Sequence, residues 1–190
     1  MTDARAVRTF LAVEVAPAIH TALVDLKCEL ARSGAAVRWV RDAGLHATVK
    51  FLGGVPKAQL PALRDALTAA VGATPPLCAA VRGLGMFPNP KRPRVVWVGL
   101  DCQPLTAVAA AVDRALAPLG YAAENRPYHA HITLGRVKEL HGWAPLDAAL
   151  MAHRDDDFGV TAIDQMVAYR SDLRRDGAVY TKLWTIPFGG

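Results

Sequence analysis

Two tripeptides of the form His-x-Thr constrain this chain more than any other feature. His46-Ala47-Thr48 and His131-Ile132-Thr133 each lie in a run rich in β-branched residues and leucine, one in each half of the chain. In a β-strand, residues two apart point to the same face, so each tripeptide offers an imidazole and a hydroxyl side by side. If the halves pack about a local two-fold axis, two imidazoles and two hydroxyls converge on one spot. Such a set suits an anion, and in particular a phosphodiester undergoing cleavage.

The surrounding pattern interleaves strands and helices. Runs rich in Val, Thr and aromatic residues predict strands, and apolar residues three and four apart predict helices. The predicted strands cover residues 7–15, 37–40, 45–52, 77–86, 94–100, a run ending near 137, 158–169 and 178–188. The predicted helices cover 17–33, 57–71, 105–119 and 143–154, and Asp176-Gly177 indicates a tight hairpin.

Strand-helix-strand-strand units occur in both halves of this order. We therefore predict an α+β, bilobal duplicated fold, in which two antiparallel sheets face each other across a central groove with helices on the outside. Residues 1–190 are expected to form a single domain made of two pseudo-symmetric lobes.

Composition sets broad limits on the class of protein. The chain has 190 residues, 52% of them hydrophobic, which is enough to bury a full core. Its formal charge of +5 favours an anionic partner, although many proteins that bind no nucleic acid have a similar charge. The three cysteines lack C-x-x-C spacing, and no signal peptide or long apolar run is evident. We expect a cytoplasmic protein with reduced thiols and no membrane partner, and we expect a monomer.

Other residues near the motifs allow more than one interpretation. His129 and His131 could chelate zinc from one strand face, but no carboxylate or cysteine lies nearby, so neither metal nor cofactor is expected. Lys50 and Arg136 could meet a phosphate oxygen. Strict alternation places Lys50 on the His46 face and Arg136 opposite His131, unless that strand bulges or ends first. Phe10 is either a platform that stacks a base or a core aromatic residue.

The chain resembles the 2H phosphoesterase superfamily, which is named for two His-x-Thr/Ser motifs, and within it the LigT-like RNA 2',3'-cyclic phosphodiesterases. The resemblance covers nearly the whole chain, in the family's order. Four segments carry it: VRTFLAVEV, RWVRDAGLHATVKFLG, GLGMFPNPKRPRVVWVGL and ENRPYHAHITLGR. Two departures are Ala130, where the family commonly has proline, and Gly135, where alanine is more usual. Neither removes a catalytic group.

This resemblance implies a metal-independent enzyme that opens 2',3'-cyclic phosphates on RNA or nucleosides to 2'-phosphates. It also implies possible 2'-5' ligation of tRNA halves, a role in RNA processing, and His131 rather than His129 as the catalytic member of the His-Ala-His stretch. Cleavage needs a base and an acid on opposite sides of phosphorus, which we assign to His131 and His46. Thr48 and Thr133 are expected to bind the non-bridging oxygens, and Arg136 to add a cation there.

Two other functions stay open from the sequence. One is a non-catalytic RNA-binding module of the same fold. The other is a sibling phosphodiesterase that acts on small cyclic phosphates or on 2'-5' oligonucleotides. The near-symmetry of the motifs leaves the acid and base assignment undecided.

Overall fold

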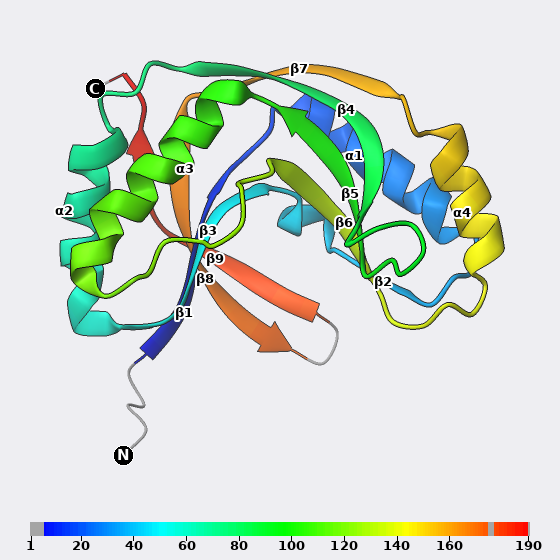
Figure 1. Cartoon of the computed structure of the whole chain (residues 1–190), viewed down its shortest axis with the longest axis horizontal. Coiled ribbons are helices and arrows are strands. Elements are labelled where there is room, and N and C mark those ends of the chain that lie inside the picture. Colours follow the sequence, from blue (N-terminus) through cyan, green and yellow to red (C-terminus); the bar gives the residue numbers. More distant parts are fainter. Residues whose placement is uncertain (1–5, 175–176, 190) are drawn as a thin grey trace.

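One antiparallel sheet runs through the whole molecule (Figure 1). This computed structural model describes residues 6–174 and 177–189. The strands are β1 (Ala6–Val13), β2 (Val37–Trp39), β3 (Ala47–Pro56), β4 (Leu77–Phe87), β5 (Val95–Asp101), β6 (His131–Val137), β7 (Asp157–Ile163), β8 (Gln165–Arg174) and β9 (Gly177–Pro187). They follow the order β7-β4-β5-β6-β3-β1-β8-β9, and β2 pairs with β6.

The sheet has two halves, each covered by a pair of helices. The helices are α1 (Pro17–Ala31), α2 (Leu60–Val71), α3 (Gln103–Leu116) and α4 (Trp143–Ala152). In Figure 1, α2 and α3 lie together on the side of β1, β3, β8 and β9, while α1 and α4 lie together on the side of β4 to β7. None of the helices in the described ranges is long and apolar enough to cross a membrane.

The predicted α+β, bilobal architecture with outer helices is therefore confirmed. The two predicted sheets are joined edge to edge where β3 meets β6, through the antiparallel pair Ala47–Ile132. This junction lies within both His-x-Thr motifs. The seam between the lobes is thus the place where the two motifs meet.

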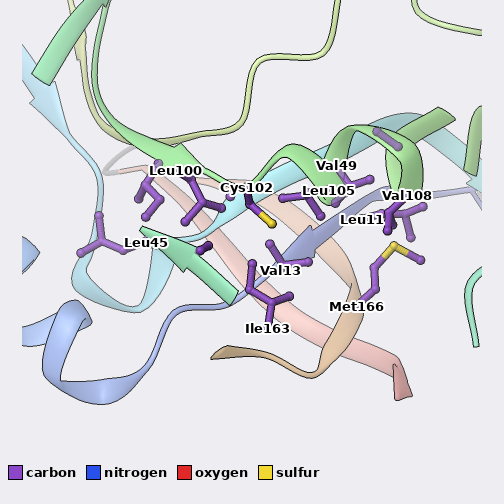
Figure 2. Packing of buried hydrophobic residues seen from close by; sticks show 14 of the residues in the cluster. Leu11, Val13, Leu45, Val49, Leu100, Cys102, Leu105, Val108, Ile163 and Met166 are labelled. Carbon is purple, nitrogen blue, oxygen red and sulfur yellow. The ribbon is translucent and has the colours of Figure 1, made fainter. Parts of the chain in front are cut away.

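Burial follows the predicted apolar patterns and fills the space between the sheet and the helices. The helix α1 starts with proline at its first turn, where a missing N–H costs nothing, and buries Ile19, Leu23, Leu26 and Leu30 along one stripe. Figure 2 shows core side chains from distant segments in contact around α3 and the neighbouring strands. The labelled residues are Leu11, Val13, Leu45, Val49, Leu100, Cys102, Leu105, Val108, Ile163 and Met166.

One predicted strand is two strands in the structure. Residues 158–169 were expected to form a single strand, but the chain leaves one lobe and enters the other at Asp164. The strand β7 pairs with β4 at one edge, whereas β8 pairs with β1 and β9. The carbonyl of Asp164 accepts a hydrogen bond from the Phe188 backbone at 2.8 Å, which fixes this crossing. The predicted Asp176-Gly177 turn lies partly outside the described residues, although Arg174 pairs with Gly177.

Candidate active site

The pairing of β3 with β6 brings the two motifs into register. Ala47 and Ile132 are paired and are fully buried in the core. In an antiparallel ladder, the neighbours of a paired position are opposite each other on the other face. The histidine of each motif is therefore opposite the threonine of the other, about a local two-fold axis. Four side chains share this face: His46, Thr48, His131 and Thr133.

The spacing of the sheet sets the scale of this patch. Directly opposed Cβ atoms lie about 5 Å apart, and diagonal neighbours, here the two histidines, lie roughly 7–8 Å apart. The two imidazoles also interact electrostatically, because a charge on His131 lowers the pKa of His46. An atom bound between the two rings is within reach of both.

Three aromatic rings surround the His46 imidazole. Phe10 on β1 stacks on it with ring centroids 4.9 Å apart, and Tyr169 on β8 lies beside both rings, with its centroid 5.9 Å from that of the imidazole. Tyr180 on β9 meets the imidazole edge-on at 5.3 Å. These rings leave the imidazole little contact with water, and they restrict its orientation.

Burial controls the protonation of His46. It lowers the pKa of His46 to about 4, because the charged ring loses its hydration. The carboxylate of Glu14 and a hydrogen bond to the backbone of Gly44 act in the opposite direction and favour the cation. His46 is therefore neutral at pH 7.

His131 is held by its own backbone. Its Nδ1 lies 2.7 Å from the carbonyl oxygen of His129, which fixes a proton on Nδ1 and leaves Nε2 as the basic nitrogen. The ring edge faces Phe87 at 4.9 Å. Burial lowers the pKa of His131, the hydrogen bond to the His129 carbonyl acts in the opposite direction, and the positive charge of Arg136 lowers the pKa further.

The two motif threonines are available to a ligand. Both are partly exposed, and among the described residues no side-chain hydrogen bond engages either hydroxyl. The Tyr128 hydroxyl does bond the backbone carbonyl of Thr48 at 3.1 Å, which ties the segment before β6 to β3. Each threonine thus keeps a donor for the patch between the histidines.

A β-bulge moves Lys50 away from the site, so its predicted place on the His46 face is wrong. The pairing steps from Ala12–Thr48 to Leu11–Lys50, with Val49 as the extra residue. The side chain of Lys50 turns to the core side, where it is 4% exposed. Its ammonium donates to the Ala122 carbonyl at 2.7 Å and pairs with Asp113. Lys50 is a structural residue that joins β3 to α3.

A second bulge does the reverse for Arg136. The pairing of β5 with β6 steps from Trp97–Thr133 to Val96–Gly135, which inserts one residue and inverts the alternation. Arg136 is exposed and acts electrostatically on both His131 and Tyr180. Strict alternation put Arg136 on the wrong face, and the bulge, which the sequence left open, brings it to the side of the histidines.

Phe10 is a core aromatic residue and not a stacking platform. It is 2% exposed, and its ring packs against both His46 and Tyr169, of which Tyr169 stacks on it at 5.2 Å. A base therefore has no free face to stack on. Phe51, the cross-strand partner of Phe10, is the exposed ring at this position, at 56%.

Sequence reasoning missed Glu14, Tyr169 and Tyr180. The Tyr169 hydroxyl donates to Glu14 at 2.6 Å, and the Lys182 ammonium donates to the same carboxylate at 2.8 Å. These residues come from both ends of the chain. Only the placement of β8 beside β1 brings them to His46, and no local pattern marks them.

Comparisons with known proteins agree with this geometry. The LigT-like phosphoesterase family matches residues 13–97 and 99–180. The RNA 2',3'-cyclic phosphodiesterase of Archaeoglobus fulgidus is 31% identical, with 93% of this chain and 97% of that protein covered. The protein of the same name from Aeropyrum pernix is 30% identical, over 86% of this chain and 93% of its own length.

Solved structures give the same result for the fold. A crystal structure of a Thermus thermophilus protein has a TM-score of 0.80 and 27% identity, and the match covers 96% of this chain and 98% of that one. Escherichia coli LigT complexed with 3'-AMP has a TM-score of 0.77 and 25% identity, over 97% and 99% of the two chains. The resemblance seen in the sequence is confirmed, and the chain belongs to the LigT-like phosphoesterase family of enzymes.

Proposed function

We propose that this protein hydrolyses RNA or nucleoside 2',3'-cyclic phosphates to 2'-phosphates without a metal ion. The observation that carries the proposal is the Ala47–Ile132 pair, which puts two imidazoles and two hydroxyls on one face about a local two-fold axis. The names of the relatives from A. fulgidus and A. pernix support the same substrate class. So does 3'-AMP, a ribonucleotide with phosphate on the ribose, in E. coli LigT.

The reaction is an in-line displacement at phosphorus. Water attacks the phosphorus of the cyclic diester and loses a proton to one histidine. The bond from phosphorus to the ribose 3' oxygen breaks, and the other histidine donates a proton to that oxygen. The product is a 2'-phosphate with a free 3' hydroxyl, and the two histidines have exchanged protonation states. Acid and base catalysis of this kind contribute about 10²- to 10⁴-fold each.

We assign the base to His131 and the acid to His46. Arg136 disfavours a charge on His131 before substrate binds, and the hydrogen bond at Nδ1 leaves Nε2 free to accept a proton. Glu14 favours a charge on His46. An anionic phosphodiester between the rings adds to the effect of Glu14 and raises the pKa of His46 on binding, so the substrate itself helps to charge its acid.

Thr48, Thr133 and Arg136 stabilise the non-bridging oxygens. Negative charge on these oxygens must be held as the transition state forms, and preorganised donors do this without rearrangement. The free hydroxyls of the two threonines and the bulge that turns Arg136 toward His131 support these roles. Because one chain supplies both motifs, a monomer has a complete site.

The same groups allow 2'-5' ligation. A 5' hydroxyl of a second RNA end takes the place of water, attacks phosphorus and loses its proton to His131. The 3' oxygen leaves with a proton from His46, and a 2'-5' phosphodiester results. In a cytoplasmic setting, tRNA halves are one source of such ends.

The decisive experiment incubates the protein with a nucleoside 2',3'-cyclic phosphate in EDTA and identifies the product isomer. We expect full activity and the 2'-phosphate. Loss of activity in the chelator contradicts metal independence, and formation of the 3'-phosphate contradicts protonation of the 3' oxygen. A protein that binds RNA but leaves the cyclic phosphate intact is a non-catalytic module of this fold. Faster turnover of 2'-5' oligonucleotides or other small cyclic phosphates identifies a sibling activity.

A further inference from the structure

A pair of arginines lies directly beyond the motif patch. Arg38 on β2 and Arg136 on β6 are cross-strand partners, and both are exposed. We propose that Arg38 binds the phosphate next to the scissile one in an RNA strand, so that the protein prefers oligonucleotide ends to mononucleotides. This inference rests on the proposed function.

The register of β2 fixes the direction of Arg38. A Cβ atom at Gly135 would lie 2.6 Å from the Val37 side chain and 2.9 Å from Trp39. The absence of a side chain at Gly135 lets these two residues pack closely against β6. Both pack against the main hydrophobic core, so Arg38 between them points to the other face, with Arg136. Gly135, where alanine is more usual in the family, therefore helps to set the position of Arg38.

The two arginines place like charges at directly opposed positions of β2 and β6. Like charges in directly opposed positions of two strands repel each other and destabilise a sheet. Among the described residues, no carboxylate forms an ion pair with either guanidinium. Two guanidinium groups at paired positions, without such a partner, suit phosphate groups, because each guanidinium can bind a phosphate through two parallel hydrogen bonds.

The two arginines lie at the same level of β6 but on neighbouring strands, away from the motif patch. His46 is opposite Thr133, and Arg38 is opposite Arg136 on the same edge of β6. Three residues of strand correspond to roughly 10 Å. Arg136 acts electrostatically on His131, so its charge reaches the scissile phosphate. Arg38, on the neighbouring strand β2, is not among the charges that shift the pKa of either histidine, so it is left for a second phosphate, which an RNA strand has and a mononucleotide lacks.

The test compares two substrates with Arg38→Gln. We expect kcat/KM for an oligoribonucleotide ending in a 2',3'-cyclic phosphate to fall about tenfold, as for one lost charged hydrogen bond. We expect kcat/KM for the mononucleotide to change less than about twofold, and kcat to stay unchanged on both, because a remote phosphate contributes uniform binding. The salt dependence of oligonucleotide binding should weaken by about 0.7 in slope, as for one lost contact to a single strand.

Two variants serve as controls. Arg64→Gln makes the same charge change on the exposed side of α2 and should affect neither substrate. Arg136→Gln should slow both substrates. Equal losses on both substrates with Arg38→Gln, or no loss on either, overturn the proposal.

Binding separates this inference from the proposed function. The anisotropy of a labelled oligonucleotide that ends in a 2'-phosphate measures the Arg38 contact without any turnover. A wild-type protein that hydrolyses neither substrate contradicts the proposed function. If Arg38→Gln still weakens binding of this oligonucleotide but not of a 2'-mononucleotide, the inference about Arg38 stands.

Discussion

The two His-x-Thr motifs are alike in sequence and in register, but their imidazoles lie in different surroundings. Phe10, Tyr169 and Tyr180 enclose His46, and a carboxylate lies nearby. His131 is held by a backbone carbonyl and has the positive charge of Arg136 nearby. Both pKa values are lowered by burial, but the charges around the two rings have opposite signs. A symmetric pair of motifs therefore carries two imidazoles in unequal electrostatic surroundings, which are set by side chains from other strands.

The residues that follow the two motifs also lie in different surroundings. One bulge after Thr48 sends Lys50 to the core, and another after Thr133 brings Arg136 to the site. Each lobe has a cation close to its motif in sequence, but only the second lobe has it on the side of the histidines. The first lobe uses its cation to hold the sheet against α3.

The largest expected effect tests whether the two histidines act as a pair. His46→Gln and His131→Gln should each lower kcat by about 10²- to 10⁴-fold, because each removes one proton-transfer step. The double variant should fall little further, since groups that act as a unit are not additive. Steady-state hydrolysis of a nucleoside 2',3'-cyclic phosphate measures this. His141→Gln, at an exposed position, is the control. Near-normal turnover in either single variant removes that histidine from the pair.

Next in size is the contrast between the two cations. Arg136→Gln should lower kcat/KM by about 10- to 100-fold and leave stability nearly unchanged, because a charged hydrogen bond is lost at an exposed position. Lys50→Gln should reduce the free energy of unfolding by about 2–4 kcal/mol, since it leaves the partly buried Asp113 without its partner. Urea denaturation and kinetics on both proteins measure the contrast. A catalytic loss from Lys50→Gln without a stability loss would contradict the assignment of the bulges.

The pH dependence tests the asymmetry directly. Because both pKa values are lowered, the bell-shaped profile of kcat/KM should have its maximum below pH 6.5. The shift is the larger for His46, so its titration near pH 4 should form the acid limb, and the titration of His131 the alkaline limb. A maximum above pH 7 argues against buried, neutral imidazoles in the free enzyme.

Glu14→Gln then decides which histidine is the acid. Loss of the carboxylate lowers the pKa of His46 and moves the acid limb to lower pH. If His46 is the acid, its protonated fraction falls and the maximum of kcat/KM drops about three- to tenfold, as for half to one pKa unit. If His46 is the base, the profile widens and its maximum does not fall. Glu29→Gln, whose carboxylate pairs with His153, is the control.

The smallest expected effect concerns the aromatic rings that surround His46. Phe10→Leu should reduce the free energy of unfolding by about 1–2 kcal/mol, because a smaller side chain leaves space in a closely packed ring cluster. Phe51→Leu, at the directly opposed and exposed position, should stay within about 0.5 kcal/mol. Thermal denaturation of both variants measures the difference. Equal losses would mean that Phe10 and Phe51 are buried alike.

Local patterns were enough to predict much of this protein. Alternating and helical periodicity predicted every helix and nearly every strand, because each depends on residues that are close in the chain. The two motifs, their threonines and their neighbouring sequence were sufficient to identify the family. The division of residues 158–169 was missed, since a β pattern continues across Asp164 although its two parts join different lobes.

Tertiary structure decided what surrounds the motifs. Alternation is a rule with a period of two, so one inserted residue reverses the direction of every later side chain. Where that insertion falls depends on hydrogen bonds to a strand far away in sequence, as for Lys50 opposite β1 and Arg136 opposite β5. The sequence therefore determined which groups are available for the chemistry. The long-range pairing of strands determined which of them reach the site and how each imidazole is charged.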